Sequence, residues 1–177
     1  MTPDTPGMDI ADLPIKAIPE YRIVKEDWSR YEICDGKATV WARVVLVKVI
    51  EIDSTKLPPG VVPKRKKDKP IYTLITQAIV TSFFDKELRK KPTTEPVSPE
   101  IIASEEGAQP IEFDLIEEPW NEYILPGSEP YLVKTKCVVT SALIFPQLIN
   151  AFGEPTIKVN TQTIITEPTK APIEKIP

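Results

Sequence analysis

The stretch YEICDGKATVWARVVLVKVIEI, residues 31–52, decides the fold class of this chain. It begins with alternating apolar and polar residues, passes through Asp35-Gly36, and continues as a run rich in β-branched residues. An Asp-Gly pair between two β-forming runs predicts a hairpin with a type I′ turn, because both central residues of that turn need positive φ. Both faces of the strand expected at 38–52 are largely apolar, so we expect this strand to be central and covered on both sides, at least along its second half.

The prolines indicate where backbone pairing stops. The chain has 20 prolines among 177 residues, about twice the usual share. None lies in 20–57 or 71–91, whereas they crowd 1–19, 58–70, 92–130 and the tail after 166. Because proline lacks a backbone donor, we expect paired strands in the proline-free stretches and connectors elsewhere.

Two parts of the chain resemble each other, which suggests an internal duplication. Trp28 and Tyr31 are echoed by Trp120 and Tyr123 at a separation of 92 residues. The segment 70–81 aligns with 155–166 at a constant separation of 85, with a shared proline, Thr-Gln pair and final threonine. The alternative is one larger sheet protein in which β-rich sequences agree by coincidence. Both interpretations place strands in the same positions.

The expected fold is therefore mainly β, with two small antiparallel units, barrel-like or sandwich-like, in tandem. One or two short helices are expected, at 82–91 and 145–152, where Ser82 could cap a helix and Pro146 could occupy a first turn. The expected boundaries are a proline-rich arm (1–19), a first β unit (20–92) with a basic loop (53–69), an acidic proline-rich linker (93–119), a second β unit (120–166) and a C-terminal arm (167–177). The arms suit extended binding to another subunit, or are frayed ends.

The composition argues against much familiar catalysis. The chain has no histidine, which excludes Ser-His-Asp and Cys-His catalysis and histidine-based zinc sites. Its six glycines are too scattered for a phosphate-binding loop. We therefore expect no catalytic residues, no metal and no cofactor, and hence not an enzyme.

Compartment signals are sparse. No stretch of eighteen apolar residues is present, so we expect no membrane span. The first twelve residues do not resemble a secretory signal. Cys34 and Cys137 are the two cysteines. They are interpreted as small buried hydrophobes in a cytoplasmic protein, with a disulfide between them as the less favoured alternative.

Two sets of residues are candidates for function. The basic cluster Lys64, Arg65, Lys66, Lys67 and Lys69 could contact nucleic acid, but a solvated loop or a contact for an acidic protein partner is favoured, since no aromatic residues are interleaved with it. The repeated aromatic residues could stack on a ligand, but packing anchors that close each hairpin over its core are favoured. These anchors are Trp28, Tyr31, Trp120 and Tyr123.

Charge is divided unevenly along the chain. Residues 1–92 carry 17 basic and 13 acidic side chains, net +4, whereas residues 93–177 carry 5 and 13, net −8. Opposite halves can attract one another within or between molecules, and open strand edges can accept a neighbour. The sequence therefore predicts a structural or assembly protein that forms a homo-oligomer or docks on protein partners. The alternative is a nucleic-acid-binding module that uses residues 64–69.

Overall fold

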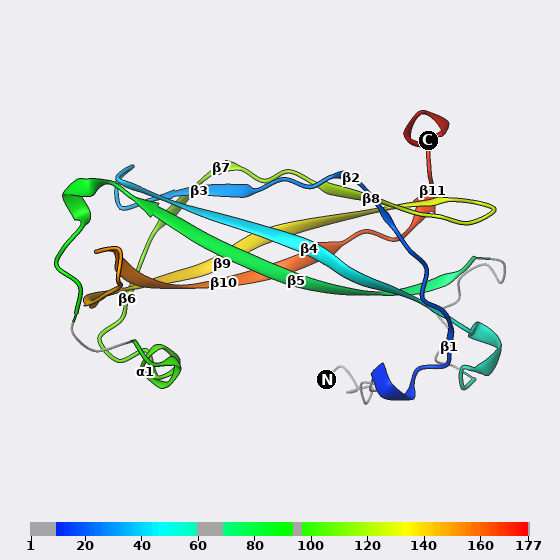
Figure 1. Ribbon diagram of the computed structural model, residues 1–177, viewed down its shortest axis with the longest axis horizontal. Coiled ribbons are helices and arrows are strands. Elements are labelled where there is room, and N and C mark those ends of the chain that lie inside the picture. Colours follow the sequence, from blue (N-terminus) through cyan, green and yellow to red (C-terminus); the bar gives the residue numbers. More distant parts are fainter. Residues whose placement is uncertain (1–9, 60–68, 94–96, 177) are drawn as a thin grey trace.

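The protein folds as an elongated sandwich of two antiparallel β-sheets (Figure 1). The computed structural model describes residues 10–59, 69–93 and 97–176. The expectation of a mainly β fold is confirmed. No helix among these residues is both long enough and apolar enough to cross a membrane.

The first sheet, here called sheet A, is built around the long strand β4 (Ala38–Ile52). On one side β4 pairs over its whole length with β5 (Ile71–Phe84). On the other side it pairs with β3 (Ser29–Ile33) and, at its far end, with β1 (Ile15–Ala17). The strand β7 (Phe113–Glu117) pairs with β3 and completes the sheet.

The second sheet, sheet B, is built in the same way around β9 (Tyr131–Ile149). One side of β9 pairs with β10 (Pro155–Ile165) and β11 (Thr169–Lys170). The other side pairs with β8 (Asn121–Leu125) and β6 (Gln109–Pro110). The strand β2 (Arg22–Lys25) pairs with β8.

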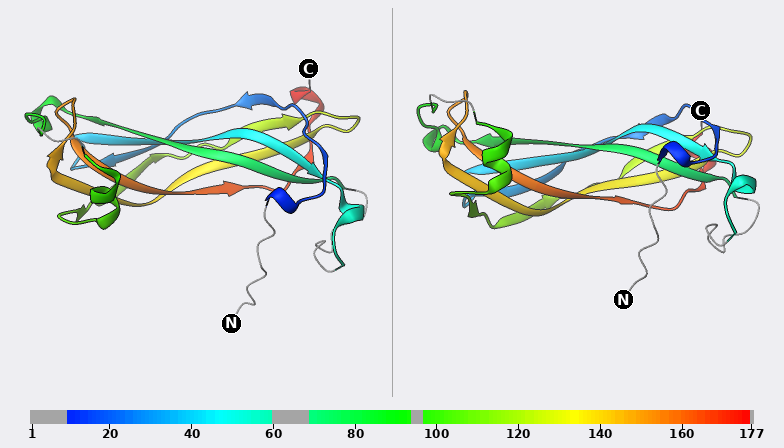
Figure 2. Two further views of the ribbon diagram at one scale, coloured as in Figure 1. Left: turned by 60° about the horizontal axis from the view of Figure 1, so that its bottom comes forward. Right: turned by 90° about the horizontal axis from the view of Figure 1, so that it is seen from below.

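The two sheets exchange strands. In sequence β2 leads into β3, but β2 belongs to sheet B and β3 to sheet A. Likewise β7 leads into β8, but β7 belongs to sheet A and β8 to sheet B. The same holds one strand earlier, because β1 of sheet A leads into β2 and β6 of sheet B leads into β7. The chain therefore crosses between the layers four times on one side of the sandwich, while β5 and β10 lie along the opposite side (Figures 1 and 2).

The strand register is the same in both sheets. Tyr31 pairs with Val40 in sheet A, and Tyr123 pairs with Val133 in sheet B. Tyr123 lies 92 residues after Tyr31, and Val133 lies 93 residues after Val40. In sheet A, Val47 has no partner on β5, since the register shifts between Leu46 and Lys48. In sheet B the equivalent residue, Thr140, is skipped in the same way. The two halves thus share their pairing, including one irregularity, as well as the similar sequences described above.

The core lies between the sheets and is filled by the inward residues of both. One cluster joins Val40, Val44 and Phe84 of sheet A to Cys137 and Val139 of sheet B. A second cluster joins Leu46 and Val49 to residues of β8 and β9. The alternation of buried and half-buried residues along β4 follows from the two-residue period of a strand.

The hairpin predicted at Asp35-Gly36 is present. Asp35 and Gly36 both have positive φ, 52° and 80°, and the Lys37 N–H donates to the Cys34 carbonyl at 3.1 Å. β4 is central, as expected. The expectation that it is covered on both sides is confirmed only at its far end, where the adjacent residues Val49 and Ile50 are both buried. Over the rest of the strand the outward face is only partly buried, and Val47 is 50% exposed.

The helices predicted at 82–91 and 145–152 are wrong. Residues up to Phe84 continue β5, where Phe84 pairs with Ala38 and is buried, and only a single 3₁₀ turn, η3 (Lys86–Leu88), follows. Residues up to Ile149 continue β9, and Pro146 falls where the register with β10 breaks, so no ladder hydrogen bond is lost. Burial in the sheets outweighs the local capping signals. The short α-helix lies elsewhere, in α1 (Pro99–Ser104), with Ser98 as its N-cap and Pro99 in its first turn.

The described parts of the expected arms and linker contribute to the sheets. The linker segment supplies α1, β6 and β7. The N-terminal segment supplies η1 (Ile10–Asp12) and β1, and the C-terminal segment supplies β11 and η4 (Ile173–Lys175). A further 3₁₀ turn, η2 (Ser54–Lys56), follows β4 and is capped by Asp53.

Candidate functional site

The four residues expected to be packing anchors occupy two kinds of position. Tyr31 and Tyr123 lie in the core and are 2% and 0% exposed. Trp28 and Trp120 are half-buried on the outward faces of the two sheets. There each indole is covered by a cation: Arg43 lies over Trp28 and Lys136 over Trp120, both 4.6 Å from the ring centroid.

Each buried tyrosine binds a glutamate that comes from the other half of the chain. The Tyr31 hydroxyl donates to Glu118 at 2.6 Å, and the Tyr123 hydroxyl donates to Glu26 at 2.8 Å. The glutamates directly follow β7 and β2, the exchanged strands. Burial raises the pKa of both tyrosines well above the usual value, and the neighbouring glutamate raises it further. Both hydroxyls therefore stay protonated and act as donors.

Further hydrogen bonds cross between the sheets at equivalent positions. The Ser29 hydroxyl donates to the Cys137 carbonyl at 2.7 Å, and the Asn121 amide donates to the Val44 carbonyl at 3.0 Å. Ser29 and Asn121 are 92 residues apart and both are buried. These contacts fasten the two halves together. They line neither of the cavities described below, so we assign them a structural role.

The outer edge of β5, here called the β5 edge, is unpaired among the described residues. The Asp85 N–H donates to the Lys37 carbonyl at 2.9 Å. In an antiparallel pair every second residue bonds to the neighbouring strand, so the odd-numbered residues before Asp85 point their backbone groups toward β4. The N–H and C=O groups of Ala78, Val80 and Ser82 therefore point away from β4. The fourteen residues of β5 include no charged residue and no proline. A long, uncharged edge without such residues is a site where another strand can pair.

The outer edge of β10, the β10 edge, is its counterpart. The Thr166 N–H donates to the Lys134 carbonyl at 2.9 Å, so the backbone groups of Thr163 and Ile165 point outward. These positions are 85 residues beyond Ala78 and Val80. Lys158 is the single charged residue of the strand. The two edges approach each other within one molecule.

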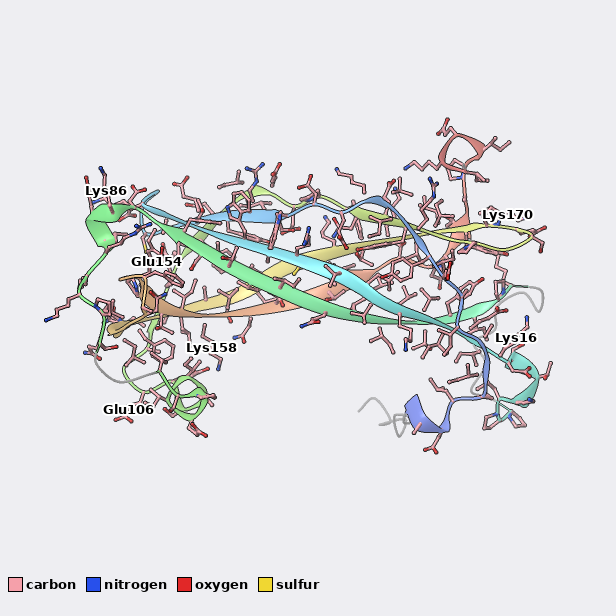
Figure 3. The ribbon with its side chains drawn as sticks, in the orientation of Figure 1. Lys16, Lys86, Glu106, Glu154, Lys158 and Lys170 are labelled. Carbon is pink, nitrogen blue, oxygen red and sulfur yellow. The ribbon has the colours of Figure 1, made fainter. Side chains whose placement is uncertain are left out.

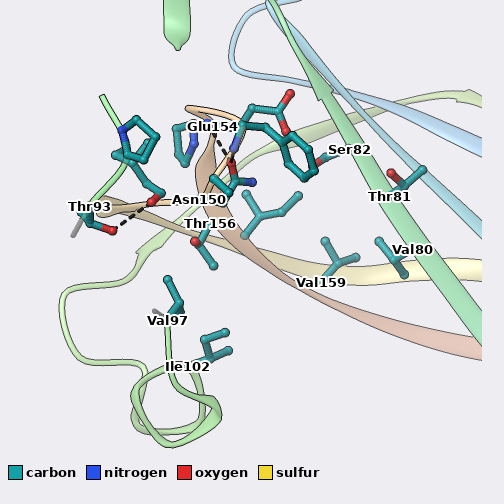
Figure 4. Close-up of a pocket in the computed structure, with 16 residues that line it drawn as sticks. Val80, Thr81, Ser82, Thr93, Val97, Ile102, Asn150, Glu154, Thr156 and Val159 are labelled. Atoms are coloured by element: carbon teal, nitrogen blue, oxygen red, sulfur yellow. Dashed lines mark hydrogen bonds between the residues drawn. The ribbon is translucent and has the colours of Figure 1, made fainter. Parts of the chain in front are cut away.

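An apolar groove opens between the two edges where they diverge (Figure 4). Its volume is about 740 Å³, and it is bordered by β5, β10, the turn that joins β9 to β10, and α1. Apolar side chains from these elements line it: Val80, Val97, Ile102, Phe152, Ile157 and Val159. Thr93 holds one wall, since its hydroxyl donates to the Ile149 carbonyl at 2.9 Å. A strand added beside residues 80–82 of β5 would direct alternate side chains toward this groove.

The outward face of sheet A carries an aromatic cluster. Trp41 lies between Trp28 and Phe83, with ring centroids 6.1 Å and 5.1 Å away. Arg30 lies over Trp41 at 5.3 Å. At the position equivalent to Trp41, sheet B has Lys134, which is 3.2 Å from Glu122. The aromatic cluster is therefore a feature of sheet A and not of both halves.

The candidate basic cluster falls largely outside the described residues, which include Lys69 but not Lys64, Arg65, Lys66 or Lys67. Lys69 is exposed and precedes β5. It borders a second cavity of about 530 Å³ together with Lys16, Glu51 and Tyr72. Cys34 and Cys137 are both free, so the disulfide alternative is wrong. The described residues contain no group of three or more Cys, Asp or Glu arranged to hold a metal ion.

Sequence reasoning missed Glu26 and Glu118 and the two strand edges. The glutamates are 92 residues apart, the same separation as the tryptophans, and this repetition was the available signal. Nothing in a sequence shows which strand of a sheet is left unpaired. No protein family, curated protein or solved structure matches the chain in comparison with known proteins.

Proposed function

We propose that this chain is a non-catalytic assembly protein that binds another polypeptide by strand addition at its open edges. The observation that carries the proposal is the β5 edge, fourteen residues without charge or proline beside an apolar groove. Main-chain hydrogen bonds along such an edge supply affinity, and the groove supplies selectivity for alternate side chains. The missing histidine agrees with a binding role.

The proposal includes an internal duplication. The shared register, the matching irregularity at Val47 and Thr140 and the reciprocal Tyr–Glu contacts support it. Two equivalent halves place two equivalent edges on one side of the molecule, which suits a protein that assembles. The proline-rich ends of the chain would extend the contact area beyond the edges.

The test is the mass of the full chain in solution as a function of concentration, by sedimentation equilibrium. We expect self-association or a co-purifying protein partner. Ala78→Lys puts a charge on the β5 edge and should weaken the association at least tenfold, because a buried unpaired charge opposes strand addition. Val47→Lys adds the same charge on the exposed outward face, away from the edge, and should leave the association unchanged. A strict monomer at high concentration with no partner would overturn the proposal.

The aromatic cluster of sheet A favours a second candidate function, binding of single-stranded nucleic acid. Bases stack on exposed aromatic rings, and arginines beside the rings attract the backbone. Phe83 is 52% exposed, but Arg30 and Arg43 are each close to a glutamate, Glu117 and Glu26, which reduces the positive potential. Titration of labelled single-stranded DNA and RNA at low salt tests this candidate. Trp41→Ala should abolish binding while Trp120→Ala on the other sheet should not, and no binding at low salt removes the candidate.

A further inference from the structure

We propose that the partner at the β5 edge is a second copy of this chain, in a two-fold dimer where β5 of each copy pairs with β10 of the other. This inference rests on the proposed function and specifies its partner. Four observations carry it: the placement of the edges, their direction, their equivalent backbone groups and the charges at their ends.

The two edges lie on the same side of the sandwich and run in opposite directions (Figures 1 and 2). Consider a two-fold axis that runs parallel to the long axis of the molecule and lies beside the two open edges. Rotation by 180° about this axis places sheet B of the second copy next to sheet A of the first. β5 then meets β10 of the second copy in the antiparallel direction, and β10 meets β5. Both edges of both copies are covered at once, which closes the assembly.

The backbone groups of the edges are spaced to match. The outward N–H and C=O groups belong to Ala78 and Val80 on β5 and to Thr163 and Ile165 on β10. Thr163 lies 85 residues after Ala78, and Ile165 lies 85 residues after Val80. The register irregularity lies at the equivalent point of each sheet, so both edges twist alike. An antiparallel ladder between them needs no change of register.

Charge favours the pairing of β5 with β10 over the pairing of β5 with β5 or of β10 with β10. Beyond the C-terminal end of β5, residues 85–91 contain four basic and two acidic side chains, and the exposed Lys69 precedes its N-terminal end. The ends of β10 are acidic: Glu154, which lies 3.8 Å from Arg89 of the same copy, precedes the strand, and Glu167 follows it. Figure 3 shows Glu106 at the same end of the molecule as Glu154.

Antiparallel pairing of β5 with β10 therefore brings residues 85–91 of one copy toward Glu154 of the other, and Lys69 toward Glu167. Figure 3 shows Lys86 and Glu154 at the same end of the molecule, the end that the two-fold axis keeps together. Pairing of β5 with β5 would bring Lys69 of one copy beside Lys86 of the other. Pairing of β10 with β10 would bring Glu154 beside Glu167. Like charges oppose both of these arrangements.

The experiment is a mixing test with two variants of the full chain at equivalent positions, Ala78→Lys and Thr163→Glu. Each variant alone should have at least a tenfold weaker dimer, because every β5–β10 pairing then contains one unpaired charge. An equimolar mixture should form a 1:1 heterodimer, since one pairing is unaltered and the other joins lysine to glutamate. Native mass spectrometry separates the three possible dimers by mass, and circular dichroism checks that each variant is folded.

The outcomes separate the inference from the proposed function. If Thr163→Glu alone dimerises as tightly as the unaltered chain while Ala78→Lys does not, β5 pairs with β5 and the inference is overturned, although assembly through the β5 edge stands. If both variants alone dimerise normally, neither edge is used and both proposals fall. A protein partner that replaces the second copy on the unaltered chain also overturns the inference.

A second measurement needs no variant. The affinity of the unaltered dimer should fall as salt is raised, because the ends attract one another through partly exposed charges. An affinity that rises with salt would indicate that like charges meet at the interface, and would contradict the β5–β10 pairing.

Discussion

Tyr123 and Glu26 meet between the sheets at 2.8 Å although 97 residues separate them in sequence. The same contact recurs between Tyr31 and Glu118, so each half of the chain supplies the acceptor for the buried tyrosine of the other half. The exchange of β2 and β7 between the sheets makes both contacts possible. Because the glutamate that binds each buried tyrosine comes from the other half of the chain, we expect the two halves to unfold together.

Tyr123→Phe should lower the free energy of unfolding by about 1–2 kcal/mol, since the hydroxyl donates to a charged acceptor in a mostly buried position. The measurement is urea unfolding followed by circular dichroism. Tyr131→Phe is the matched control: Tyr131 is also buried, but its hydroxyl donates no hydrogen bond to another of the described residues. Equal effects of the two substitutions would contradict a specific role for the Tyr123–Glu26 contact.

The same tyrosines should make the protein sensitive to alkali. Their pKa values in the folded state are raised above the usual tyrosine value of 10.0, by burial first and by the neighbouring glutamate second. The unfolded chain therefore releases these protons at lower pH than the folded chain, and stability present below about pH 10 is lost as the pH rises beyond it. Urea unfolding at pH 8 to 11 should show this loss, and the double variant Tyr31→Phe with Tyr123→Phe should show a shallower one. Identical slopes would refute this explanation.

Gly153→Ala should destabilise the protein by about 1–3 kcal/mol, because the position has a φ of +80° and an added Cβ would lie 2.7 Å from the Lys90 carbonyl oxygen. Gly127→Ala is the control, since its φ is not in the left-handed region and the nearest atom would be 3.8 Å away. Thermal unfolding of both variants checks the difference. A stable Gly153→Ala would mean that the turn between β9 and β10 is not held against residue 90.

The thiols should differ in accessibility. Burial raises the pKa of both Cys34 and Cys137, so both should react with Ellman's reagent more slowly than free cysteine at pH 8. Cys34, in the hairpin turn, should account for the reaction of the folded protein, and Cys137 should react only on unfolding. Cys34→Ser should therefore remove the native reaction. A mass two units below that of the reduced chain under native conditions would instead indicate a disulfide.

Local sequence signals predicted the hairpin at Asp35-Gly36 and the positions of the long strands, because β-branched runs and turn residues act over short distances. They did not predict that β2 lies in sheet B and β7 in sheet A. A strand as short as Arg22–Lys25 has no sequence feature that indicates which strand it pairs with. They also predicted helices at 82–91 and 145–152, where burial of Phe84 and Phe145 in the sheets overrides the caps. The sequence grouped the two tryptophans with the two tyrosines as packing anchors and did not show that the tyrosines lie in the core while the indoles lie half-buried under cations.

Residue-resolved hydrogen exchange along β5 tests the central claim most directly. The Ile79 N–H points toward β4, and the Val80 N–H points to the open edge, so the two adjacent amides report on different partners. We expect Ile79 to be protected at all protein concentrations, and Val80 to become protected only as the concentration passes through the association range. A Val80 amide that exchanges freely when the protein is fully associated would contradict strand addition at the β5 edge.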